Sequence, residues 1–175
     1  MIIKASELLC LPEFSGQDAE TLQGKIDAIE SLIRSYTNNN FQNRAVRFWA
    51  ASIGGRLQGA STFLRIGDTV QISQSSVNDG LYIISNLSDG DTVVDRDLFE
   101  IAKNLVTKVE YPSDVKAGVI HMLQWEQENR RKVGIKSETL SRHSVTYYDQ
   151  DASNQVMGYP VSLLGFLQPY MKARF

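Results

Sequence analysis

Cysteine, histidine and long apolar runs are scarce in this sequence. Cys10 is the one cysteine, so an internal disulfide is excluded, and the two histidines lie too far apart to give a zinc-site spacing. No apolar run approaches the roughly 20 residues of a membrane-spanning helix. Glu7 and Pro12 interrupt the apolar N-terminus, which does not have the pattern of a signal peptide. We expect a protein of a reducing compartment, without membrane contact, in which Cys10 is a small buried group.

The sequence also lacks an excess of either charge. Its 18 Lys and Arg residues oppose 20 Asp and Glu residues, for a formal net charge of -2. A protein that coats nucleic acid or an anionic membrane is therefore not indicated, and any such contact would be local. The charge is uneven along the chain: residues 1–40 sum to -3, residues 41–111 to -1 and residues 112–175 to +2. Attraction between copies, or an internal salt-bridge network, would both account for this distribution.

Two parts of the chain follow a helical period. Residues 18–36 repeat apolar side chains at steps of three and four, and Asp18 or Ser15 can cap the start of this helix. After Pro112, Ser113 is a good N-cap for a second helix, and Gly134 is a natural stop. Pro160 and Pro169 bound a short closing helix. The apolar positions of the two long helices are Leu22, Ile26, Ile29, Ile33 and Tyr36, then Val115, Val119, Met122 and Leu123.

Between residues 41 and 111 the period changes to two and turn residues multiply. Asn78-Asp79-Gly80 is a strong hairpin signal, because an Asp-Gly pair tolerates the positive φ of a tight turn. Five or six short strands predict a small antiparallel barrel of the SH3-like kind, since closure removes exposed edges. We therefore predict an α+β fold in which a helical domain of residues 1–40 and 112–175 is interrupted by an inserted β-barrel domain of residues 41–111.

Ser141, His143, Ser144 and Asp149 place a nucleophile, a base and an acid close together. The segment has no nucleophile elbow or Gly-rich oxyanion loop, and in an extended strand Asp149 would lie roughly 20 Å from His143. We expect no enzymatic activity, and a hydrolase using His143 is the alternative. The alternating Asp89, Asp91, Asp95 and Asp97 do not match a calcium loop and are better explained as a solvated turn. We expect no metal and no cofactor.

Residues 136–159 contain β-forming side chains but no matching strand nearby in the sequence. A strand of this kind needs another edge, and in a helical domain that edge can lie on another molecule. We therefore interpret the segment as an interaction arm. Its predicted interface residues are Ser137, Glu138, Thr139, Leu140, Arg142, His143, Val145, Tyr147 and Tyr148.

The last third of the chain resembles the C-terminal half of head-to-tail connector (adaptor) proteins of long-tailed bacteriophages and related prophages. The similarity lies in two stretches, YPSDVKAGVIHMLQWEQENRRKVGIKSETLSRHSVTYYD and MGYPVSLLGFLQPYMKARF. The helix of residues 18–36 is compatible with the early helices of that family. Members of this family are built around an up-and-down helical core. The strand block of residues 41–111 departs from the compact members, which join their helices directly.

The resemblance implies a structural virion protein without enzymatic activity. Assembled in the host cytoplasm, it would form a dodecameric ring between the portal protein and the next neck or tail-completion protein. DNA would pass through the ring without sequence readout. The arm, residues 137–148, would pair with or lie across a neighbouring subunit. The closing helix and basic tail would dock on the portal through Tyr159, Pro160, Leu164, Phe166, Tyr170, Lys172, Arg174 and Phe175.

A second interpretation makes the β-barrel a nucleic-acid-binding or peptide-binding module. It requires aromatic and basic side chains on one face, which Arg47, Phe48, Trp49, Arg56 and Arg65 could supply. The simpler expectation is that Phe48 and Trp49 fill the barrel core, since aromatic residues dominate small cores.

Overall fold

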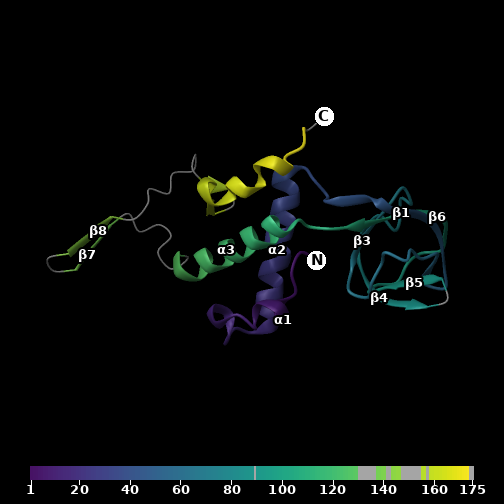
Figure 1. Cartoon of the computed structure of the whole chain (residues 1–175), viewed down its shortest axis with the longest axis horizontal. Helices are drawn as coiled ribbons and strands as arrows, with labels where there is room; N and C mark the ends of the chain where they lie inside the picture. The colour runs from purple at the N-terminus through teal and green to yellow at the C-terminus, as the bar shows by residue number, and fades with distance from the viewer. Residues whose placement is uncertain (89, 130–136, 141–142, 147–154, 157, 174–175) are drawn as a thin grey trace. The chain divides into compact units, whose positions relative to one another are not determined.

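A computed structural model describes residues 1–88, 90–129, 137–140, 143–146, 155–156 and 158–173. The chain divides into two compact units (Figure 1). Met1 and residues 39–111 form one, called the sheet unit below, and residues 2–38 and 112–175 form the other, called the helical unit. The sheet unit is therefore inserted between the two parts of the helical unit, and each is described by itself.

Six antiparallel strands make up the sheet unit. Their hydrogen-bonded order is β1-β2-β5-β4-β3-β6, and β6 also pairs with β1, so each strand has two neighbours. The predicted combination of helices with an antiparallel sheet is confirmed. The strands are β1 (Gln42–Ile53), β2 (Arg56–Gln58), β3 (Thr69–Ser73), β4 (Gly80–Ser88), β5 (Asp91–Val94) and β6 (Ile101–Val109).

Turn chemistry explains most of the strand connections. Gly54 and Gly55, with φ of 57° and 75°, join β1 to β2, as expected for a tight hairpin. The connection from β3 to β4 differs from the predicted Asp-Gly turn. Positive φ values fall on Gln74 and Ser76, while the Asp79 carboxylate accepts hydrogen bonds from the Ser75 backbone N–H at 2.8 Å and its hydroxyl at 2.9 Å. The loop is thus held by a side chain rather than by glycine.

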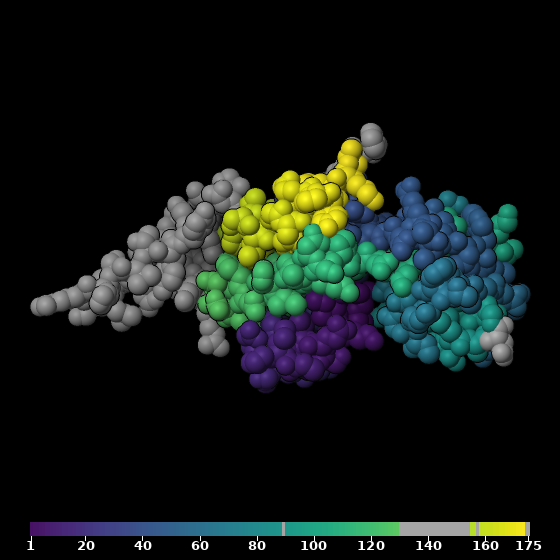
Figure 2. Space-filling model, in the orientation of Figure 1, coloured from purple at the N-terminus to yellow at the C-terminus, as the bar shows by residue number. Residues whose placement is uncertain are grey.

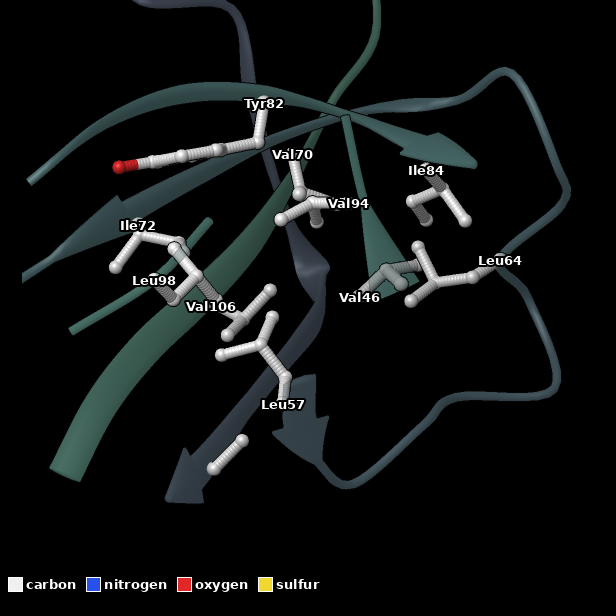
Figure 3. Packing of buried hydrophobic residues seen from close by; sticks show 11 residues of the cluster. Val46, Leu57, Leu64, Val70, Ile72, Tyr82, Ile84, Val94, Leu98 and Val106 are labelled. Atoms are coloured by element: carbon white, nitrogen blue, oxygen red, sulfur yellow. The ribbon is translucent and has the colours of Figure 1, made fainter. Parts of the chain in front are cut away.

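Inward-facing side chains, mostly aliphatic, form the core of the sheet unit (Figure 3). Phe48 is partly buried against this core, but Trp49 is 53% exposed, so the expectation that Trp49 fills the core is wrong. Successive side chains of a strand point to opposite faces, and Val46 and Ala50 occupy the inner face of β1. The core residues are Val46, Ala50, Leu57, Leu64, Val70, Ile72, Tyr82, Ile84, Val94, Leu98 and Val106.

The two ends of the sheet unit lie side by side. The rings of Phe41 and Tyr111 are 4.7 Å apart between centroids, and the Glu110 N–H donates to the Phe41 carbonyl at 2.9 Å. The chain therefore enters and leaves the sheet unit at neighbouring positions.

The helical unit is built from α1 (Ala5–Leu8), η1 (Pro12–Phe14), α2 (Ala19–Thr37), α3 (Ser113–Asn129) and the 3₁₀ helix η4 (Val161–Tyr170). α1, α2, α3 and η4 pack against one another within this unit (Figure 2). Both predicted long helices are confirmed, and the closing helix is 3₁₀ rather than α. Ser113 is the first residue of α3 instead of its N-cap, and the predicted stop at Gly134 lies outside the described residues. The buried apolar side chains of α2 and α3 are Leu22, Ile26, Ile29, Leu32, Ile33, Val115, Val119, Met122 and Leu123.

Local contacts fix the ends of these helices. The Asp18 carboxylate accepts from the Thr21 N–H at 2.8 Å, which identifies Asp18 rather than Ser15 as the cap of α2. α2 ends at Thr37, and the following residue, Asn38, caps it in the left-handed conformation with φ of 49°. Cys10, expected to be buried, is exposed, and its thiol donates to the Ser6 carbonyl at 3.3 Å. Within the described residues, no helix combines the length and apolar character required to cross a bilayer.

Two small hairpins complete the described secondary structure. β7 (Ser137–Leu140) pairs with β8 (His143–Thr146), and β9 (Gln155–Val156) pairs with β10 (Tyr159–Pro160), each antiparallel. Both follow α3 in the chain and precede η4.

Candidate functional site

The predicted interaction arm is a hairpin. The register of β7 and β8 runs from Ser137 opposite Thr146 to Leu140 opposite His143. The expectation that this strip has no mate within its own chain is therefore wrong, because its two halves pair with each other. No third strand joins β7 or β8 among the residues that the structure describes. Of the residues named for this arm or for the alternative hydrolase, Ser141, Arg142, Tyr147, Tyr148 and Asp149 lie outside the described residues.

The predicted portal-docking residues do not form one exposed surface. Tyr159 is 9% and Leu164 1% exposed, so both belong to the core of the helical unit. Phe166 is partly buried against α3, where its ring lies next to Gly118. The Tyr170 hydroxyl donates to the Asp114 carboxylate at 2.7 Å, which raises the pKa of this tyrosine above its usual 10.0. Tyr159, Leu164 and Phe166 are therefore buried or partly buried within the helical unit instead of facing outward.

Pro160 is partly buried and Lys172 is exposed. The backbone N–H of Lys172 donates to the Thr37 carbonyl at 2.8 Å, which leaves its side chain as a cation on the surface. Arg174 and Phe175 lie outside the described residues. Within the described part of the predicted docking set, the accessible portion thus reduces to Lys172 and the partly exposed faces of Pro160, Phe166 and Tyr170.

A groove of about 530 Å³ lies along α2 in the helical unit. Its polar end is formed by Glu126, which is 5% exposed, accepts from the Tyr159 hydroxyl at 2.6 Å and lies 3.6 Å from the Lys25 ammonium. The remaining walls are largely apolar and small. The lining residues are Thr21, Gly24, Lys25, Ala28, Ile29, Leu32, Glu126 and Tyr159.

The outer face of β1 in the sheet unit carries the exposed Trp49. The Lys103 ammonium lies 5.8 Å from the centroid of its ring, a cation–π distance. Arg47 points to the same face as Trp49, because the two are separated by one residue of a strand, and its Nε donates to the Thr107 hydroxyl at 2.9 Å. We call Arg47, Trp49 and Lys103 the tryptophan face.

The two strands around the tryptophan face carry four basic side chains, of which Lys108 forms an ion pair with Asp68 at 2.9 Å. β1 and β6 contain Arg44, Arg47, Lys103 and Lys108 but no Asp or Glu. The structure therefore brings together Arg47 and Trp49 of the predicted binding set. It does not add Arg65, whose guanidinium donates to the carbonyls of Thr62 and Leu64 in its own loop. Lys103 was not predicted, because only strand pairing places it beside Trp49.

A buried polar network supports the inner side of the same strand. Ser52, Asn78 and Asn104 are each at most 1% exposed. The Asn78 amide donates to the Asn104 side-chain oxygen at 3.1 Å and to the Phe99 carbonyl at 2.9 Å, and it accepts from the Phe99 N–H at 2.9 Å. The Ile101 N–H donates to the Ser52 hydroxyl at 3.0 Å. This network fixes the segment that leads into β6 and hence the strand that carries Lys103.

The part of the chain that the structure describes contains no cluster of three His, Cys, Asp or Glu side chains that could hold a metal ion. Hydrogen bonds from Thr21 and Ser75 lower the pKa of Asp18 and Asp79, respectively, below 3.8. Both carboxylates hold a local turn or cap, which accounts for these shifts without a functional role.

A scan against protein-family models and a search of curated proteins for relatives gave no match. The functional argument therefore rests on the residues and surfaces described above.

Proposed function

We propose that the chain is a structural protein of the bacteriophage neck. Its copies form a ring that joins the portal to the tail or to the next neck protein and extends the DNA channel, without catalysis. The sequence similarity to head-to-tail connectors suggests this role. The observation that carries it is the β7–β8 hairpin, which has no third strand among the described residues.

The hairpin has a physical reason to bind another chain. Each of its strands has four residues, and a single two-stranded hairpin is at best marginally stable in water. Its outer edges carry backbone N–H and C=O groups that a strand of a neighbouring copy can pair with. Addition of a strand would stabilise the hairpin and join two subunits at once.

The sheet unit is a poorer donor of such an edge. We propose that it is a small barrel of the SH3-like kind, because each of its six strands already has two hydrogen-bonded neighbours. A sheet without a free edge does not recruit strands. Subunit pairing through backbone hydrogen bonds therefore falls to the hairpin, and the sheet unit would contribute through side chains.

Portal docking requires a smaller set of residues than the sequence suggests. Because Tyr159 and Leu164 are buried, contact with the portal would fall to Lys172 and the accessible parts of Pro160, Phe166 and Tyr170. We propose that these residues and the C-terminal tail form the portal-facing surface.

Electron microscopy of the purified chain, alone and with the portal protein of the same phage, tests the proposal. Rings are expected for the wild type. Replacement of residues 137–146 by a Gly-Ser linker of equal length should give a protein with unchanged circular dichroism in its helical bands that no longer forms rings. A wild-type protein that remains monomeric under all these conditions would contradict the proposed function.

Nucleic-acid binding by the sheet unit is a second candidate function. The tryptophan face favours it, because an exposed ring flanked by cations can stack on a base while the cations contact phosphates. The sheet unit as a whole carries seven basic and eight acidic residues, so phosphate attraction would be confined to this face. Salt-sensitive binding of a fluorescent single-stranded oligonucleotide, lost in Trp49→Ala, would support this function. Absence of binding at low salt would remove it.

A further inference from the structure

We infer that the tryptophan face of one copy docks on the α2 groove of a second copy, with the Trp49 ring inserted between the small side chains of that groove. This contact rests on the proposed ring and specifies the side-chain interface between its subunits. It explains two features that the folding of either unit leaves unexplained, an exposed tryptophan and an open groove.

Trp49 has the properties of an anchor residue. The residue is 53% exposed although a tryptophan can bury 150–250 Å² of surface, and such side chains dominate the binding energy of many interfaces. It is set on a rigid element, since β1 is hydrogen-bonded to both β2 and β6. Lys103 and Arg47 place positive charge beside it. A partner must therefore offer an apolar recess with negative charge at its rim.

The α2 groove meets these requirements. An engineered cavity of about 150 Å³ binds benzene, so the 530 Å³ groove has room for an indole ring. Ala28, Ile29 and Leu32 give it an apolar wall, and Gly24 presents no side chain at its surface, with nothing within 4 Å of a Cβ built there. Glu20 and Asp27, both exposed, are the helix neighbours of Gly24 at four residues before it and three after. Inside the groove, the positive charge of Lys25 and the negative charge of Glu126 lie 3.6 Å apart and offset each other.

The two surfaces are different, and this difference governs the assembly. A contact between unlike patches leaves each copy with one unused tryptophan face and one unused groove until the chain of contacts closes. Such heterologous contacts form rings when the rotation between copies closes, as the proposed function requires. Ring closure then makes every weak contact depend on the others, which raises the stability of the whole assembly.

Sedimentation velocity of the full-length chain over a range of concentrations tests this interface. Trp49→Ala should raise the concentration at which half of the protein is assembled by at least about tenfold. Ala28→Arg should do the same from the other side, because the arginine occupies the groove and repels Lys103 and Arg47. The matched controls are Phe63→Ala, which removes another exposed ring of the sheet unit, and Ser31→Arg, which adds the same charge to α2 outside the groove. Both controls should assemble like the wild type.

Mixing the two variants gives the sharpest test. Trp49→Ala retains an intact groove and Ala28→Arg retains an intact tryptophan face, so one competent contact is possible between them. At concentrations where neither variant assembles alone, an equimolar mixture should therefore contain dimers, and at those concentrations the dimers should not grow into rings. Raising the NaCl concentration from about 0.05 M to about 0.5 M should weaken the dimer, because the charged rim is screened.

Other outcomes separate this interface from the proposed function. If the Gly-Ser replacement of the hairpin abolishes rings while Trp49→Ala and Ala28→Arg assemble normally, the tryptophan contact is wrong and the connector function stands. If both variants fail to assemble and their mixture forms no dimer, a specific face-to-groove contact is wrong. Binding of single-stranded DNA that depends on Trp49, with unchanged assembly, would assign the face to nucleic acid instead. A wild type that never assembles would overturn both proposals.

Discussion

The hydroxyl of Tyr159 donates a 2.6 Å hydrogen bond to the carboxylate of Glu126, and both residues are buried in the helical unit. Tyr159→Phe should lower the free energy of unfolding by about 1–3 kcal/mol, because a buried carboxylate loses a donor that water cannot readily replace. Urea unfolding followed by circular dichroism measures the change. Tyr36→Phe, at a partly exposed position of α2, is the matched control and should change stability by less than about 0.5 kcal/mol.

Gly118 allows η4 to approach α3. A Cβ at this position would lie 2.4 Å from the Phe166 ring, so Gly118→Ala should destabilise the protein by about 1–3 kcal/mol through overpacking. Gly24→Ala is a natural control, because this glycine is also within a helix but a Cβ there would meet nothing within 4 Å. That variant should gain about 0.5–1 kcal/mol from helix propensity. Equal effects of the two substitutions in thermal unfolding would contradict the packing at Gly118.

The Ser52–Asn78–Asn104 network stabilises the sheet unit from within. Asn78→Ala would leave the Phe99 N–H and the Asn104 amide oxygen without this partner and should cost about 2–3 kcal/mol. Hydrogen exchange of the amides of β6 should accelerate in parallel. Asn86→Ala, at an exposed position of β4, should leave both stability and exchange nearly unchanged. Loss of stability without faster exchange in β6 would contradict a role of Asn78 in holding that strand.

The carboxylate of Asp79 makes the stability of the β3–β4 loop depend on pH. Hydrogen bonds from the Ser75 backbone and hydroxyl lower its pKa in the folded state below 3.8. Its contribution is therefore present above the unfolded pKa and is lost as the pH falls through the lower, folded value. Asp79→Asn should be less stable than the wild type at pH 7, and the difference should shrink below about pH 4. A difference that is constant from pH 7 to pH 3 would contradict this explanation.

Some features that follow from neighbouring residues could be predicted from the sequence. The helical period of α2 is such a signal and appears in the structure, and of the two candidate caps, Asp18 and Ser15, the structure selects Asp18. The outward position of Trp49 was missed because β1 carries apolar residues on both faces, so alternation alone cannot tell which face is inside. Which face of β1 is buried depends on its pairing with β6.

Contacts between distant residues could not be predicted. Ser52 and Asn78 are 26 residues apart, as are Asn78 and Asn104, and only the sheet brings them together. The hairpin was missed for a different reason. The two residues between Leu140 and His143 are Ser and Arg, which lack the Gly or Asn that marks a tight turn, so the segment resembled one continuous strand.

The contact between Phe41 and Tyr111 has a consequence for the history of the gene. An inserted unit that starts and finishes at one aromatic pair can be gained, lost or exchanged as a cassette in one recombination event, with no change required in the residues that hold α2 against α3. Proteins that keep these helices but carry a different cassette, or none, are therefore to be expected.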